Sequence, residues 1–88
     1  MKAIVIDKFG GPEVLLQREV ATPKIGPGEV LIRLLAAGVN RFDVTTRRGE
    51  IPYAAVSFPH VPGVEGAGTV AEVGSGVTAF QIGDRVVP

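Results

Sequence analysis

Six glycines fall between Pro62 and Val87, and short segments rich in β-branched residues separate them. Glycine adopts backbone conformations with φ above zero and lets other groups approach the main chain closely. Such a segment builds tight turns between short strands, and it places a glycine-lined surface beside the acid Glu65. This part of the chain therefore predicts short strands joined by turns.

Gly and Pro residues separate short apolar segments along the whole chain. We expect strands at residues 2–7, 14–20, 29–37, 67–73 and 84–87, because apolar branched residues fill these segments and turn residues bound them. Residues 29–37 have the composition of a helix as well, but their length and flanking Pro and Gly favour a buried strand. Residues 51–62 contain three prolines and are expected to form an irregular loop.

One short helix is expected near residues 40–48. Asn40 is a favourable N-cap, Asp43 approximates a capping box, and Gly49 ends the helix. Arg47 lies four residues after Asp43, which predicts a structural ion pair between them. Short strands with a single short helix indicate a mainly β fold, a small barrel or sandwich.

Composition narrows the classes of partner. The 88 residues suffice for one small domain, and nine Lys and Arg balance nine Asp and Glu, so we expect no nucleic-acid partner. There is no Cys, which excludes disulfides and thiolate metal sites. The N-terminus has only a short apolar run, residues 3–6, which is too short for a signal peptide or membrane span. We therefore expect a cytoplasmic protein with no membrane partner. Because the chain stops at Pro88, directly after an apolar strand, we expect it to be a piece of a longer protein.

The segment Gly66–Ala71 fits the G-x-G-x-x-A form of a dinucleotide fingerprint, with Asp84 near the distance expected of a ribose-binding acid. That fingerprint binds pyrophosphate only between a strand and the N-terminus of a helix. Here prolines precede the glycines, and the alternating TVAEV that follows stops at Gly74. We interpret the segment as the start of a strand whose glycines permit close packing.

Several polar residues are candidates for chemistry, each with a structural alternative. Asn40 can hydrogen-bond a ligand amide or carbonyl while also capping the helix. Glu65 is either a functional acid or an ordinary turn or salt-bridged acid. His60 is the only His, and a metal site there would need carboxylates from elsewhere, so no metal is expected. Tyr53 and Phe58 line an apolar pocket or seal the core, and the core is favoured.

Three blocks carry a resemblance to a known superfamily. They are KAIVIDKFGGPEVL, PGEVLIRLLAAGVNRFDVTTRRG and PGVEGAGTVAEVGSGVTAFQIGDRVV, in this order. They resemble the start of the medium-chain dehydrogenase/reductase superfamily, and within it the zeta-crystallin-type NADPH:quinone oxidoreductases. The resemblance implies a GroES-like, partly open β-barrel that is incomplete in residues 1–88. It also implies a Rossmann domain, absent from this chain, that binds most of the NADPH.

The resemblance further implies chemistry without zinc. Zinc-dependent alcohol dehydrogenases of the superfamily carry Cys where this chain has Asn40, and His where it has Val64. An amide and an isopropyl group leave too few ligands for a catalytic zinc. A zinc-free relative transfers hydride directly from NADPH to a small quinone or enone. A segment without the Rossmann domain is expected to be inactive by itself, and the full-length protein is expected to be a homodimer.

The resemblance also assigns site residues. Asn40 is expected near the nicotinamide, as a catalytic and cofactor-binding residue, and Glu65 is expected to be a second catalytic residue. The family commonly has a Tyr on the cofactor at the position of Thr45, so Thr45 is expected at the cofactor, and whether Tyr53 replaces that Tyr stays open. Two alternatives remain: a non-enzymatic GroES-like binding module, and an enoyl reductase of the same superfamily.

Overall fold

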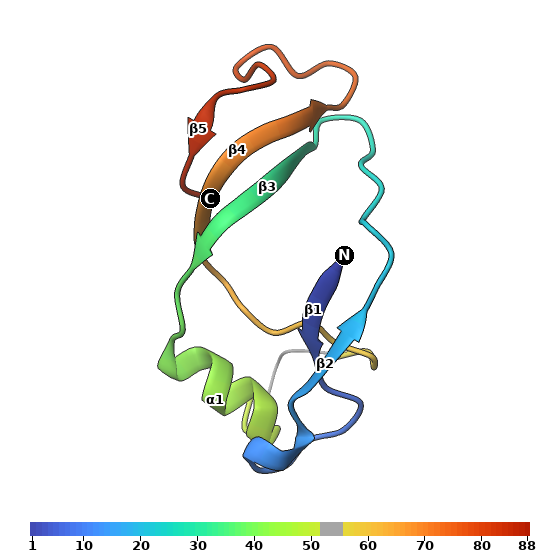
Figure 1. Ribbon diagram of the computed structural model, residues 1–88, viewed down its shortest axis with the longest axis vertical. Helices are drawn as coiled ribbons and strands as arrows, with labels where there is room; N and C mark the ends of the chain where they lie inside the picture. The colour runs from blue at the N-terminus through green and yellow to red at the C-terminus, as the bar shows by residue number, and fades with distance from the viewer. Residues whose placement is uncertain (52–55) are drawn as a thin grey trace. The chain divides into compact units, whose positions relative to one another are not determined.

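The computed structural model describes residues 1–51 and 56–88 (Figure 1). Tyr53 lies outside the described residues. In chain order the elements are β1 (Lys2–Val5), the 3₁₀-helix η1 (Pro12–Val14), β2 (Leu16–Glu19), β3 (Val30–Ala37), α1 (Arg41–Arg48), β4 (Gly66–Val73) and β5 (Arg85–Val86).

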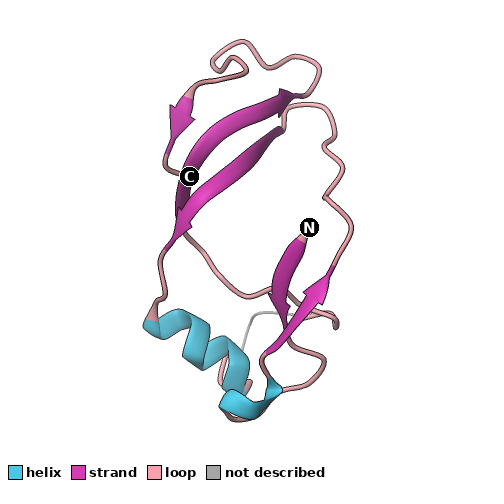
Figure 2. Ribbon diagram, in the orientation of Figure 1, coloured by secondary structure: helices cyan, strands magenta, loops and turns pink. Residues whose placement is uncertain are grey.

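The described strands form two small open sheets, and α1 is the α-helix among them (Figure 2). This confirms the predicted mainly β, incomplete GroES-like fold with one short helix. The chain divides into two compact units: residues 1–21 with 39–64, and residues 22–38 with 65–88. None of the helices in the described residues is long and apolar enough for a bilayer crossing.

The first unit is built on the antiparallel hairpin of β1 and β2, in which Val5 pairs with Leu16. Its buried side chains include Val5, Ile6 and Val14, each no more than 5% exposed. Ile6 also exchanges two backbone hydrogen bonds with His60, at 2.9 and 3.0 Å. Through this isolated bridge, His60 of the predicted irregular loop pairs with the residue that follows β1.

The strand expected at residues 14–20 begins later than predicted. Pro12–Val14 forms a single 3₁₀ turn, in which the Val14 N–H donates to the Gly11 carbonyl at 3.1 Å, and β2 starts at Leu16. Pro12 occupies the start of this turn because its ring fixes φ near the helical value and it has no N–H to satisfy. The apolar side chains of Val14 and Leu15 fit a strand and do not predict this turn.

Helix α1 ends as the sequence predicts, at a left-handed Gly49 with φ of 75°. A Cβ at this position would also lie 2.8 Å from the Phe9 ring. The residue must therefore be glycine for two reasons: its backbone conformation and the close approach of an aromatic side chain. Phe9 in turn contacts Phe58 edge-on, with ring centroids 5.0 Å apart.

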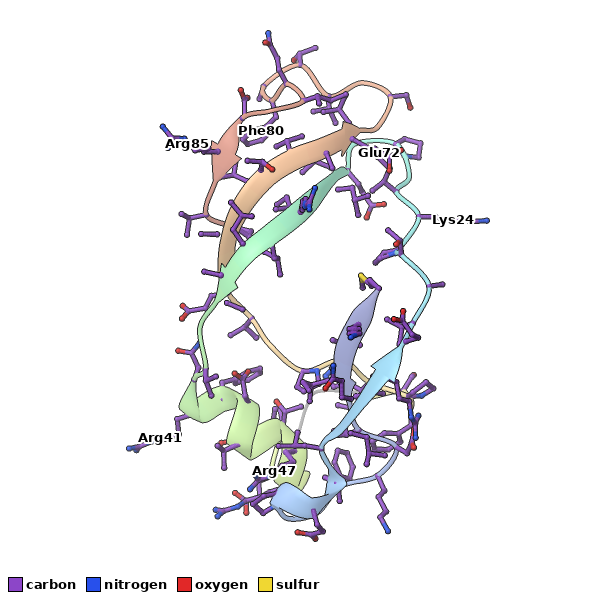
Figure 3. The ribbon with its side chains drawn as sticks, viewed as in Figure 1. Lys24, Arg41, Arg47, Glu72, Phe80 and Arg85 are labelled. Atoms are coloured by element: carbon purple, nitrogen blue, oxygen red, sulfur yellow. The ribbon has the colours of Figure 1, made fainter. Side chains whose placement is uncertain are left out.

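The predicted ion pair between Asp43 and Arg47 was wrong. Arg47, at the C-terminal end of α1 (Figure 3), donates from Nε to the Gly10 carbonyl at 3.2 Å, and the Gly10 N–H donates to the Arg47 carbonyl at 2.9 Å. Asp43 is instead held at the N-cap of the helix, by the backbone N–H of Asn40. Each side chain thus satisfies a backbone group that the helix or a neighbouring loop leaves unpaired.

The second unit is an antiparallel sheet in the order β3-β4-β5, in which the three strands lie side by side (Figure 1). The strand predicted at residues 29–37 is confirmed, but its burial is not. Residues 30–32 are half-buried, whereas residues 33–37 are exposed, and Leu35 is 73% exposed. A three-stranded sheet covers little of either of its own faces, and among the described residues of this unit Val70 is the buried apolar side chain.

The glycines of the G-x-G-x-x-A segment lie in strand β4 and serve its pairing with β3. The chain is extended from Gly66 to Val73, and a turn and β5 follow it in place of a helix. A Cβ on Gly68 would overlap the Arg33 carbonyl oxygen and lie 2.9 Å from Leu34 Cα. The interpretation of this segment as a closely packed strand is confirmed, and Asp84 lies in the turn before β5.

Candidate functional site

Asn40 is positioned by the start of helix α1. Its backbone is extended, with φ of −119° and ψ of 158°, and it forms a capping box with Asp43. The Asn40 N–H donates to Asp43 Oδ2 at 2.9 Å. The reciprocal contact, from the Asp43 N–H to the Asn40 side chain, is the weaker half, because the same N–H donates to the Asn40 carbonyl at 3.0 Å. Asn and Asp three residues apart thus fix the site locally.

Two polar atoms of this capping box are buried without a partner among the described residues. They are Asn40 Nδ2, a donor, and Asp43 Oδ1, an acceptor. A buried polar group without a hydrogen bond costs about 1–3 kcal/mol, so each atom calls for a partner that the described residues do not supply. Asn40 was predicted as a site residue, but Asp43 was assigned only a structural role. A capping box uses only one of the two carboxylate oxygens of Asp43. The sequence pattern could therefore have indicated that the other oxygen needs a further partner.

Thr45 lies on the same helix and is half-buried. Its hydroxyl donates to the Arg41 carbonyl at 3.1 Å, one turn earlier. The hydroxyl therefore has no free hydrogen to offer a ligand but keeps lone pairs as an acceptor. Five helical positions correspond to about 140° around the axis, so Thr45 and Asn40 lie on different sides of α1.

Glu65 belongs to the second unit and directly precedes β4. Its side chain is exposed and lies against Gly38, because a Cβ on Gly38 would overlap Glu65 Oε1 and lie 2.6 Å from Cδ. The carboxylate borders an open hollow of about 350 Å³ whose other lining residues are mostly small: Ala36, Ala37, Gly38, Gly66, Ala67 and Val87. Glu65 is the one ionisable residue in that lining.

The residues at the two zinc-ligand positions do not fit a catalytic zinc. Asn40 supplies a carboxamide and Val64 an isopropyl group, while Zn²⁺ in proteins is bound by thiolate, imidazole and carboxylate groups. The nearest carboxylate in the sequence is that of Glu65, directly after Val64, and the described residues contain no cluster of three or more potential ligands.

The comparisons with known proteins agree with this geometry. Residues 26–88 match the family model of the alcohol dehydrogenase GroES-like domain. The chain is 45% identical over 86 residues to an alcohol dehydrogenase of Geobacillus stearothermophilus, covering 98% of this chain and 25% of that protein. It is 45% identical over 87 residues to a quinone oxidoreductase of Lama guanicoe, covering 98% and 26%. The structure of Escherichia coli quinone oxidoreductase complexed with NADPH superimposes with a TM-score of 0.90 at 39% identity, covering 99% and 26%.

The fold and the family match define a GroES-like domain built on open β-sheets. The chain belongs to the alcohol dehydrogenase GroES-like domain family, within the medium-chain dehydrogenase/reductase superfamily that its three sequence blocks predicted. It spans about a quarter of the length of the relatives named above.

Proposed function

We propose that this chain is the N-terminal part of the GroES-like catalytic domain of an NADPH-dependent quinone oxidoreductase that works without zinc. The full-length protein would transfer hydride from NADPH to a small electron-poor acceptor, a quinone or an enone. A Rossmann domain outside these 88 residues would bind most of the cofactor. Relatives named quinone oxidoreductase, and the NADPH complex of the Escherichia coli protein, support the acceptor and the cofactor.

The observation that carries this proposal is the carboxamide of Asn40. It stands where zinc-dependent relatives have a cysteine, and its Nδ2 is buried without a partner among the described residues. An amide N–H is a hydrogen-bond donor and not a zinc ligand. The position is therefore suited to hold a carbonyl oxygen, on the nicotinamide or on the acceptor, and not a metal ion.

The candidate residues of the two units have separate proposed roles. Bound NADPH supplies the hydride. Asn40 donates a hydrogen bond that orients the nicotinamide end of the cofactor, and the Thr45 hydroxyl offers an acceptor on the same helix. Reduction of a quinone by hydride leaves an oxyanion that must gain a proton. Glu65, exposed at the rim of a small-residue hollow, would relay that proton from water.

The proposal is tested on the full-length protein by following NADPH oxidation with a simple quinone as the acceptor. We expect turnover that is unchanged after prolonged treatment with a zinc chelator. Loss of turnover under chelation, with recovery on adding Zn²⁺, would contradict the proposal.

A second candidate is an alcohol dehydrogenase, which the similarity to the Geobacillus stearothermophilus protein of that name favours. This candidate predicts oxidation of simple alcohols with a nicotinamide cofactor. The reaction is measured by following reduction of the cofactor instead of its oxidation. A screen that includes 2-enoyl substrates separates the enoyl reductase alternative. A folded full-length protein that binds no nicotinamide cofactor would instead favour a non-enzymatic binding module.

A homodimer and a cytoplasmic location are also part of the proposal. Size-exclusion chromatography with light scattering tests whether the full-length protein is a homodimer.

A further inference from the structure

We propose that Gly38 is a positioning residue for Glu65: the missing side chain at position 38 leaves the space in which the Glu65 carboxylate lies. The inference rests on the proposed function, in which Glu65 moves a proton. The inference adds Gly38 to the candidate site residues. Gly38 takes no part in the chemistry itself, and it has no side chain that could form a hydrogen bond or carry a charge.

The pairing of β3 with β4 brings the two residues together. Ala37 at the end of β3 pairs with Gly66 at the start of β4 in antiparallel register. The next residue outward on each strand is Gly38 on one side and Glu65 on the other, so the two face each other just beyond the ladder. Residues that are directly opposite on antiparallel strands have side chains within contact distance.

The contact at Gly38 involves the side chain of Glu65 alone. An added Cβ would overlap Oε1 and lie 2.6 Å from Cδ and 2.9 Å from Cγ, and these are the nearest atoms. Real Cβ atoms essentially never approach another heavy atom within 3.0 Å. The backbone of Gly38 does not explain the glycine, because the glycines with positive φ are at other positions.

Alanine at position 38 would therefore turn the carboxylate away at little cost in stability. The far end of a glutamate is flexible and solvent-exposed here, so it can rotate to another staggered conformation. The carboxylate would move by about 1 Å or more, a displacement that can cost roughly 100-fold in rate when it affects a reacting group. The glycine thus determines the position of the acid and contributes little to the stability of the fold.

The test is a double-mutant cycle in the full-length enzyme. We expect Gly38→Ala to lower kcat by about 10- to 100-fold with little change in KM or in the unfolding midpoint. In a Glu65→Gln background the same change should lower kcat less than about twofold, because the positioned group is already gone. Gly26→Ala is the matched control: its Cβ would lie 3.3 Å from Glu29 Oε1, in the same unit but outside the hollow, and it should leave kcat unchanged.

Each other outcome is decisive. An equal loss in the Glu65→Gln background means that the new methyl blocks the hollow directly, and a large loss of stability in Gly38→Ala means that it strains the backbone; either overturns the inference. If Glu65→Gln leaves kcat unchanged, the proposed role of Glu65 fails, and positioning is judged by carboxyl ¹³C NMR. The Glu65 Cδ resonance, assigned by its absence in Glu65→Gln, should then shift in Gly38→Ala and not in Gly26→Ala. An unshifted resonance overturns the inference.

Discussion

Replacing Gly68 by alanine should force β4 away from β3. The added Cβ would overlap the Arg33 carbonyl oxygen and lie 2.8 Å from the Arg33 carbonyl carbon and 2.9 Å from Leu34 Cα. These are backbone atoms of a paired strand, so no side-chain rotation relieves the overlap. Since Cβ contacts below 3.0 Å essentially never occur, the two strands must separate locally or shift in register.

The magnitude follows from the hydrogen bonds that flank the position. Gly68 pairs with Leu34, and Thr69 pairs with Arg33, in the middle of the longest strand pair of the described chain. Separation weakens about two or three ladder hydrogen bonds, each with a net contribution of about 0.5–1.5 kcal/mol. The expected loss is therefore roughly 1–4.5 kcal/mol, a range that reaches the upper end of single-substitution effects.

Urea unfolding of the full-length protein, followed by circular dichroism, measures this loss. We expect a lower midpoint at an unchanged slope for Gly68→Ala. Gly38→Ala is the control, because its equally close contact is with the flexible end of Glu65, and it should change the unfolding free energy by less than about 0.5 kcal/mol. Equal losses in the two variants, or no loss in Gly68→Ala, would refute the distinction between backbone and side-chain contacts on which both expectations rest.

Three further predictions concern the first unit. Asn40→Ser keeps a good N-cap but removes the unpaired amide donor without adding a charge beside Asp43, so the thermal midpoint should hold while kcat/KM for quinone reduction falls about 10-fold or more; unchanged kinetics would leave Asn40 a purely capping role. A side-chain hydrogen bond from Arg18 lowers the pKa of Asp7, so this pair stabilises the fold above the unfolded pKa near 4 and its contribution is lost as the pH falls through the lowered value. Asp7→Asn should accordingly cost more stability at pH 7 than at pH 2, and a pH-independent difference in unfolding midpoint would contradict the cause. Gly49→Ala combines left-handed strain with overlap of the Phe9 ring and should lower the unfolding free energy by roughly 1–3 kcal/mol, which an unchanged urea midpoint would exclude.

The elements of this fold are predictable where their causes are local. Branched apolar segments between Gly and Pro gave β1, β3, β4 and β5 to within a few residues, and the Asn40 cap with Gly49 gave α1. The late start of β2 follows from the local turn at Pro12, whereas the other errors involve partners far away in the chain. Arg47 bonds the carbonyl of Gly10, 37 residues away, and so is unavailable to Asp43. The exposure of the second half of β3 depends on what covers the sheet, which no property of residues 33–37 encodes.

The candidate site divides in the same way. Local capping preferences place Asn40, but the burial of its Nδ2 depends on packing that the sequence does not reveal. Glu65 stands out as an acid among glycines, yet its exposure was not predictable, and neither was its contact with Gly38. That contact joins residues 27 positions apart, and it becomes visible only once the register of β3 and β4 is known.

Under the proposed function, the glycines that imitate a nucleotide-binding fingerprint would act on catalysis only indirectly. Gly68 lets β4 lie close to Arg33, and two residues earlier on the same strand, beyond a local register shift, Gly66 pairs with Ala37. The same register places Glu65 opposite Gly38. A substitution at Gly68 that shifts the strands should consequently displace the carboxylate as well, and it should lower kcat through Glu65 even in the fraction of protein that remains folded. In the proposed function, the fingerprint-like segment is therefore a strand that sets the position of the acid Glu65.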